Sequence, residues 1–254
     1  MSSFTKRMLA AAALATGIAA GAPALAANYP DFTINENSVP GTSPLGNPAL
    51  VADRLNGLYT EVFTPTFTGP GSGTFVANAT YNISAYYQND ILVPSLLGCS
   101  LAPCYNLYAT LQATGNFSTA VNGDITFTGT SGNLQLFLDP DQSVGGDLLL
   151  LSTSDLVTGE GHFRPSLASG DFEIIWTAVM LSSPTGENFF TAPRPFYLMI
   201  DANGNFTENP LAGGPISGSA NAFFFPNQVA EPNSVLLFGI AVMALAGVMR
   251  RRRA

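Results

Sequence analysis

The most restrictive feature of the sequence is the strict alternation of apolar and polar residues along several segments. From Phe75 to Ala85 every second residue is apolar, and the residues between them, apart from Val76, are polar. Residues 107–114 alternate in the same way. Successive side chains of a β-strand point to opposite faces, so this period predicts strands with one buried and one wet face.

The same criteria predict strands along most of the chain. Asn122-Gly123 and Asn203-Gly204 predict hairpin turns, because both residue types tolerate positive φ. Trp176 shares its register with Phe172 and Ile174, which predicts a core position. A short helix is predicted at residues 49–55. Further strands are predicted at residues 58–67, 124–128, 134–138, 148–153, 172–181, 195–201 and 216–225. Many short strands with frequent turns predict an all-β fold, an antiparallel β-sandwich or barrel-like single domain.

The N-terminal segment has the organisation of a secretory signal peptide. Lys6 and Arg7 precede an apolar run at residues 8–20, and the small residues Ala24 and Ala26 follow it. A basic start, a short apolar run and an A-x-A site predict a signal peptide over residues 1–26, cleaved after Ala26. A membrane anchor is the alternative, but a bilayer core takes about 20 helical residues.

The C-terminal segment predicts a short transmembrane helix. Fifteen apolar residues, 235–249, precede a basic end at residues 250–253. Fifteen helical residues rise about 22 Å, against a hydrocarbon core about 30 Å thick. Arginines beside a span stay cytoplasmic, so residues 27–228 are expected outside the membrane.

The complete tail, residues 229–254, resembles the PEP-CTERM sorting signal, in which a Pro-Glu-Pro motif precedes an apolar span and a basic end. Here Ala230 stands in place of the first proline. The resemblance implies that an exosortase-type membrane protease recognises the tail and cuts near the motif. A plain membrane anchor without sorting is the alternative. The residues implied in sorting are Ala230, Glu231, Pro232, Arg250, Arg251, Arg252 and Arg253.

The chain between the two ends is strongly acidic. Six of the nine basic residues belong to the terminal segments, so the stretch from Ala27 to Pro232 holds three arginines against all 17 acidic residues, a net charge of −14. Such a charge repels phosphate backbones, so nucleic acid is excluded as a partner. Since the body has no lysine, it can form neither a lysine Schiff base nor a P-loop.

The residues that could carry chemistry favour structural roles. Cys99 and Cys104 are expected to form a local disulfide in an exported chain, whereas zinc or redox chemistry lacks a nearby histidine and C-x-x-C spacing. His162, the only histidine, is expected to face solvent in a turn beside Glu160. Residues 201–208 alternate oxygen-bearing side chains, but their glycine does not follow the EF-hand order, which favours a hairpin turn over calcium. We therefore predict no catalytic residues, metal site or cofactor.

Aromatic side chains leave a carbohydrate-binding module as the alternative function. Tyr86 and Tyr108 fall on the otherwise polar faces of their strands and are candidate sugar platforms. A glycosidase is a third hypothesis, since paired carboxylates suffice for that chemistry, but scattered acids give no specific pair.

Short stretches of the body resemble the flocculation-associated PEP-CTERM proteins of floc-forming bacteria, in the same order along the chain. These stretches are residues 28–33, 38–41, 53–57, 59–61, 136–141 and 195–197. The resemblance implies a non-enzymatic role in cell aggregation, as floc or biofilm, within an exopolysaccharide matrix. The expected route runs from a membrane-anchored intermediate with a cytoplasmic C-terminus to the cell surface or extracellular matrix.

Overall fold

The computed structural model describes residues 30–99, 103–142, 148–194 and 198–226. The predicted signal peptide and the predicted sorting tail, and the helix expected in each of them, lie outside the described residues. Within those residues, no helix combines the length and the apolar character needed to cross a membrane.

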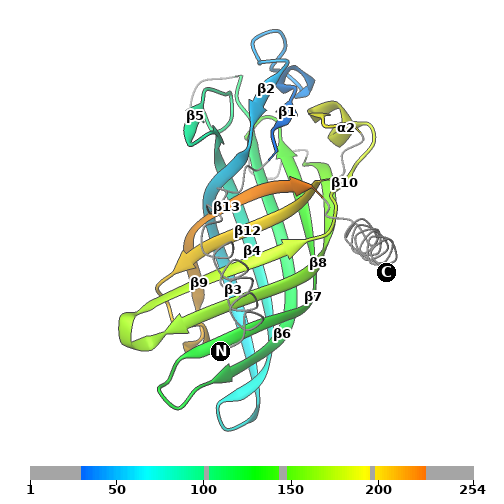
Figure 1. Ribbon diagram of the computed structural model, residues 1–254. Coiled ribbons are helices and arrows are strands. Elements are labelled where there is room, and N and C mark those ends of the chain that lie inside the picture. Colours follow the sequence, from blue (N-terminus) through cyan, green and yellow to red (C-terminus); the bar gives the residue numbers. More distant parts are fainter. Residues whose placement is uncertain (1–29, 100–102, 143–147, 195–197, 227–254) are drawn as a thin grey trace, which may run out of the picture.

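Eight long antiparallel strands of the described chain close into a barrel (Figure 1). Each strand pairs with the next one along the chain, and the last pairs back with the first. The strands are β3 (Arg54–Gly69), β4 (Ser72–Gln88), β6 (Asn106–Thr119), β7 (Ile125–Asp139), β8 (Leu149–Arg164), β9 (Ser169–Trp176), β12 (Leu198–Phe206) and β13 (Pro215–Pro226). The all-β prediction is confirmed in its barrel form, an up-and-down barrel.

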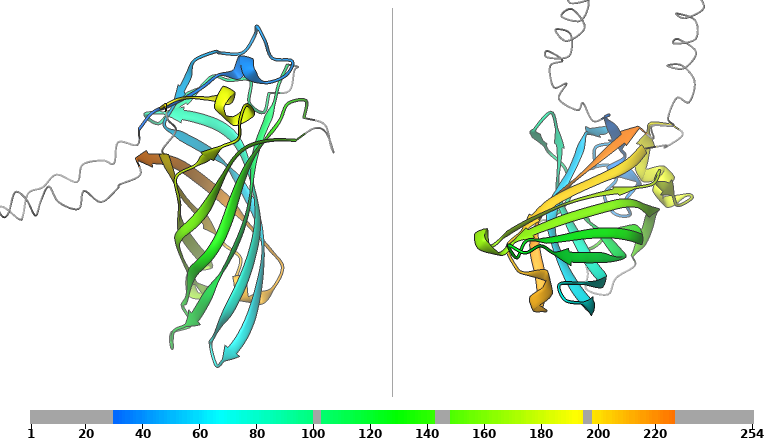
Figure 2. Two further views of the ribbon diagram at one scale, coloured as in Figure 1. Left: turned by 90° about the vertical axis from the view of Figure 1, so that its right-hand side faces the viewer. Right: turned by 60° about the horizontal axis from the view of Figure 1, so that its bottom comes forward.

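Short elements cover one end of the barrel and together form what we call the cap (Figure 2). The cap consists of β1 (Phe32–Ile34), η1 (Glu36–Ser38), β2 (Leu50–Ala52), α2 (Thr185–Phe189) and β11 (Phe190–Ala192). Its three strands form a small antiparallel sheet in the order β11-β1-β2. Two further strands extend the barrel sheet, β5 (Ile91–Val93) beside β4 and β10 (Met180–Leu181) beside β8. The 3₁₀ turns η2 (Pro165–Leu167) and η3 (Pro210–Ala212) join strands at the opposite end.

The core contains two aromatic layers with small residues between them. Under the cap, the rings of Phe32, Phe190 and Phe224 lie 4.7 to 6.2 Å apart. Toward the other end, a second layer has ring distances of 4.7 to 6.1 Å and consists of Phe63, Phe75 and Phe127. The strands between the layers carry inward-facing alanines and glycines. Trp176 is fully buried, as predicted.

Several sequence predictions were wrong in detail. Residues 49–55 form no helix, because Leu50 and Ala52 are buried alternately as strand β2, which pairs with β1. The stretches 124–128 and 134–138 belong to the single strand β7. The stretch 172–181 is divided between β9 and β10.

The two Asn-Gly pairs have different structures. Asn122-Gly123 lies in the turn between β6 and β7, where only Gly123 has positive φ, at 89°. Asn203-Gly204 forms no turn and continues through β12. A Cβ at Gly204 would lie 2.7 Å from the Phe172 ring, so this glycine allows close ring packing and has no role in chain reversal.

Candidate functional site

The outer wall of the barrel, meaning the outward-facing side chains of its eight strands, is built mainly from uncharged hydrogen-bonding residues. Strand β4 shows the pattern, since Thr74, Asn78, Asn82 and Ser84 are exposed between buried neighbours. Because strand pairing sets outward residues side by side, these side chains form rows that cross several strands.

The first such row, which we call the amide row, crosses four strands. Asn78 of β4 pairs with Gln112 of β6, which pairs with Asn133 of β7, and Asn133 pairs with Asp155 of β8. All four side chains are exposed. The Gln112 amide donates a hydrogen bond to Asn78 Oδ1 at 3.0 Å. The row therefore presents three amide groups and one carboxylate side by side on the barrel surface.

The second row, which we call the mixed row, crosses five strands on another side of the barrel. Its members are Glu160, Glu173, Asn203, Asn221 and Asn56, each paired with the next across β8, β9, β12, β13 and β3. The Asn56 amide donates to Asn221 Oδ1 at 2.9 Å. Four of the five residues, all except Asn56, border a shallow polar hollow. Two adjacent carboxylates make this row negative at one end and neutral at the other.

An aromatic pair lies on the outer wall between β6 and β7. Tyr108 and Phe137 are paired across the strands, and their rings stack with centroids 5.3 Å apart and planes at 18°. Both are partly exposed. Burial raises the pKa of Tyr108, and the charge of Asp139 raises it further, so the phenol stays a neutral donor. Tyr108 thus lies where a sugar platform was predicted.

The prediction that Tyr86 is a second sugar platform was wrong. Its side chain is fully buried, and its hydroxyl lies 3.1 Å from the Tyr105 hydroxyl. The pairing of β3 with β4 shifts register at Asn56/Gly57 and leaves Ser84 without a partner. Such a bulge reverses the alternation beyond it, so Tyr86 turns inward.

His162 is exposed, as predicted, but it lies within strand β8 and not in a turn. Its cross-strand partners are Thr126 and Asp171. Thr126 Oγ1 lies 3.5 Å from His162 Nδ1, within hydrogen-bonding distance. His162 and Asp171 border the same polar hollow as the mixed row.

The segment considered for calcium lies mostly within strand β12, where it is extended. Asn203 and Asn205 follow each other on one side of the strand and pair with Glu173 and Asp171. Within the described parts of the chain, no three His, Cys, Asp or Glu residues are grouped closely enough to hold a metal ion. The segment contributes to the mixed row.

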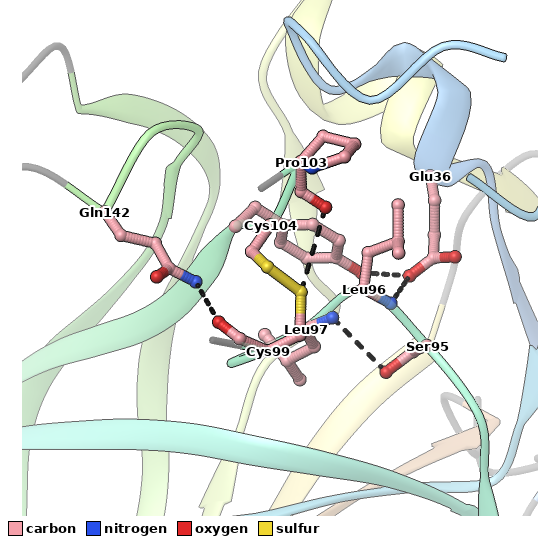
Figure 3. Close-up of a disulfide and its surroundings, with 9 residues drawn as sticks. Glu36, Ser95, Leu96, Leu97, Cys99, Pro103, Cys104 and Gln142 are labelled. Atoms are coloured by element: carbon pink, nitrogen blue, oxygen red, sulfur yellow. Dashed lines mark hydrogen bonds between the residues drawn. A yellow bond between two sulfur atoms is a disulfide. The ribbon is translucent and has the colours of Figure 1, made fainter. Parts of the chain in front are cut away.

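The two cysteines form a disulfide near the capped end (Figure 3), the pairing that the sequence predicts. Their Cα atoms are 5.5 Å apart. Beside the bond, Gly98 N donates to the Tyr105 carbonyl at 2.8 Å, and Leu97 bridges to Tyr105. The disulfide therefore holds the end of the β5–β6 connection against the start of β6.

The disulfide-linked β5–β6 connection contacts the cap through Glu36. The Glu36 carboxylate is buried and accepts hydrogen bonds from Leu96 N at 2.8 Å (Figure 3), the Tyr105 hydroxyl at 2.9 Å and Asn47 N at 3.0 Å. Three donors compensate the buried charge, as such a carboxylate requires. Nothing in the sequence pattern singled out Glu36, because its three donors come from distant segments.

No family model, curated protein or solved structure matches this chain. The cleavage residues Ala24 and Ala26 and the sorting residues from Ala230 to Arg253 lie outside the described residues.

Proposed function

We propose that the protein is an exported, non-enzymatic surface or matrix component that promotes cell aggregation by contacting exopolysaccharide through its outer wall. The observation that carries this proposal is the amide row together with the Tyr108–Phe137 pair, which lies on two of the same strands, β6 and β7. Amide side chains both donate to and accept from sugar hydroxyls, and aromatic faces cover the apolar faces of sugar rings.

The acidic charge of the body favours neutral contacts. A body carrying three arginines and 17 acidic residues repels anionic polymers and other copies of itself. The amide row carries one carboxylate among its four members, so a polymer can approach it at lower electrostatic cost. Export and sorting by an exosortase-type protease are part of the same proposal and rest on the terminal segments.

A secreted carbohydrate-binding module is the second candidate, and the exposed stack of Tyr108 on Phe137 favours it. The two proposals differ in what the tail does. A matrix component that acts at the cell surface needs its sorting tail, whereas a diffusible binding module keeps its affinity without it.

The test is deletion of the coding region, scored for floc formation, with complementation by matched variants. Tyr108→Ala should lower floc formation and weaken binding to the isolated exopolysaccharide by about tenfold, the loss of one stacking contact. Phe67→Ala is the matched control, since Phe67 is 58 % exposed but lies at the far end of β3.

A deletion strain that still forms flocs would refute the aggregation role. A tail-less form that restores flocs fully, with unchanged polysaccharide binding, would favour the diffusible module.

A further inference from the structure

The barrel interior contains an unfilled space between its two aromatic layers. The space measures about 130 Å³ and its walls are almost entirely apolar. Small residues from several strands line it, among them Ala77, Ala79, Ala113, Gly159, Ala202 and Ala220. Eight-stranded barrels have interiors that either fill with side chains or hold one small ligand.

The small side chains leave this space open where larger ones would fit. A Cβ placed on Gly159 would have its nearest contacts at 3.7 Å, which is ordinary packing distance. Alanine and glycine are weak strand formers, whereas valine and isoleucine favour strands. An empty apolar cavity costs stability in proportion to its volume. An occupant would recover that cost.

One carboxyl group lies in the wall of this space. Glu61 of β3 lies between the buried Tyr59 and Phe63 on the inward face, and its cross-strand partners are Ala79 and Ile216. No hydrogen bond or ion pair to Glu61 occurs among the described residues. Glu160 also borders the space, but its side chain is exposed on the outer wall.

The other polar groups facing inward are already engaged. The Tyr59 hydroxyl donates to the Asn205 carbonyl at 3.2 Å, and the Tyr81 hydroxyl donates to the Ala220 carbonyl at 3.0 Å. Glu61 is therefore the polar group of this wall that is left to meet an occupant.

We propose that the barrel binds a small, mainly apolar primary amine, with its hydrocarbon body among the alanines and its ammonium group on the Glu61 carboxylate. An apolar cavity of roughly 150 Å³ holds a molecule the size of benzene. The occupant therefore has an aromatic ring or a chain of about six carbons. An ammonium group is selected because a carboxylate in an apolar wall gains most from an opposite charge, and another carboxylate would be repelled.

Ionisation of Glu61 gives the site a pH dependence. Burial raises the pKa of Glu61 to about 7, so the carboxylate that binds an ammonium forms as pH rises through 7. The facing elements contribute little competing charge. β4 presents Ala79 and β13 presents Ile216, and Tyr59 titrates far above this range. Glu208, in the connection after β12, stays ionised throughout, since hydrogen bonds lower its pKa.

The experiment compares hexylamine, 1-hexanol and hexanoate, which share one hydrocarbon body, by titration calorimetry on the protein recovered from producing cells. At pH 8 hexylamine should bind about tenfold more tightly than hexanol, the gain from one charge-assisted hydrogen bond, and hexanoate should bind least. Hexylamine affinity should fall about tenfold at pH 6, where Glu61 is mostly protonated.

Matched variants separate the carboxylate from the cavity. Glu61→Gln should bring hexylamine to the affinity of hexanol, and the control Glu173→Gln, at an exposed carboxylate that does not border the space, should leave the series unchanged. Ala79→Leu and Gly159→Val each fill the space, from β4 and from β8, and should abolish binding of all three compounds while cooperative thermal unfolding is retained.

Absence of binding by all three compounds to the wild-type protein would overturn the proposal. Equal binding of the amine and the acid would overturn the role of Glu61. Binding that survives both cavity-filling variants would place the site elsewhere.

Discussion

Two glutamates of this protein are held in opposite ways. Glu36 is buried in the cap and accepts hydrogen bonds from three donors. Glu61 lies in an apolar wall, and burial raises its pKa to about 7. Hydrogen-bond donors compensate the burial of a carboxyl group, whereas a carboxyl group in an apolar wall without donors gains from a proton. Glu36 therefore stabilises the junction of cap and barrel, and Glu61 provides a titratable group inside the barrel.

We predict that Glu61 lowers the stability of the ligand-free protein as pH rises from about 4.5 to about 7, its ordinary and folded-state pKa values. The folded state holds the proton more tightly than the unfolded chain in this window. Stability is therefore highest below the unfolded pKa and is lost as pH rises through the folded one. The loss is at most about 3 kcal/mol.

Urea unfolding at several pH values, for the wild type and Glu61→Gln, measures this effect. As pH rises from about 4.5 to about 7, the unfolding free energy of the wild type should fall relative to that of Glu61→Gln. A difference that stays constant from pH 4 to pH 8 would contradict it.

The strands themselves were largely predictable, and their irregularities were not. Alternation places Ala77, Tyr81 and Ile83 inward, as the structure has them. The bulge at Ser84 cannot be seen in the sequence, because it results from pairing with β3. It reverses the direction of Tyr86, one of two aromatic residues on which the carbohydrate hypothesis rested.

Closure of the sheet was also beyond sequence reasoning. A sandwich and a barrel share the same alternation, and they differ in whether the last strand pairs with the first. Here β13 pairs with β3 along nine residues. The interior space depends on this closure, since its lining residues come from strands all around the barrel. Without the closed barrel, Glu61 could not be assigned to a site. The sequence did contain one indication, because Glu61 is a charged residue at an apolar position between Tyr59 and Phe63.

At the level of one element, the disulfide should act as a clip on the β5–β6 connection. Removing it in Cys99→Ser/Cys104→Ser should lower the unfolding free energy by about 2 kcal/mol, because the closed loop is short. Unfolding should remain cooperative, since the barrel strands do not depend on the clip. Chemical unfolding with and without reductant measures the effect.

The double variant is the control for the reductant. Reductant should lower the unfolding free energy of the wild type and leave that of the variant unchanged. Labelling of both thiols in the untreated, denatured wild type would show that the bond is absent.

At the scale of the whole molecule, the terminal segments predict two cuts. The extracellular form should begin near Ala27 and end near Pro232, because the predicted signal peptidase site and the proposed sorting motif lie there. Intact-mass measurement of the protein from culture medium and from membranes tests this. Recovery of full-length chains alone, all in the membrane fraction, would leave a simple anchor as the explanation.

The acidic body also predicts that divalent cations support aggregation. Like charges repel within roughly 10 Å at 0.1 M salt, whereas calcium accepts six to eight oxygen ligands and can join carboxylates of separate molecules. Chelation of calcium and magnesium should weaken flocs, and either ion should restore them. Monovalent salt at matched ionic strength should restore them much less, because it screens charge without bridging. Flocs that are unaffected by chelation would favour neutral contacts alone.

The order of strands around the barrel has a consequence for the timing of folding. Every barrel strand pairs with its neighbours along the chain, except that β3 waits for β13. On the proposed export route the N-terminus emerges first, so β3 through β12 can form an open sheet while residues 215–226 are still crossing the membrane. Until then the edge of β3 is unpaired, and an open edge pairs readily with other chains. Secretion that stalls late would thus leave a sheet able to join its neighbours edge to edge, and rapid delivery of the last strand protects the exported protein from that fate.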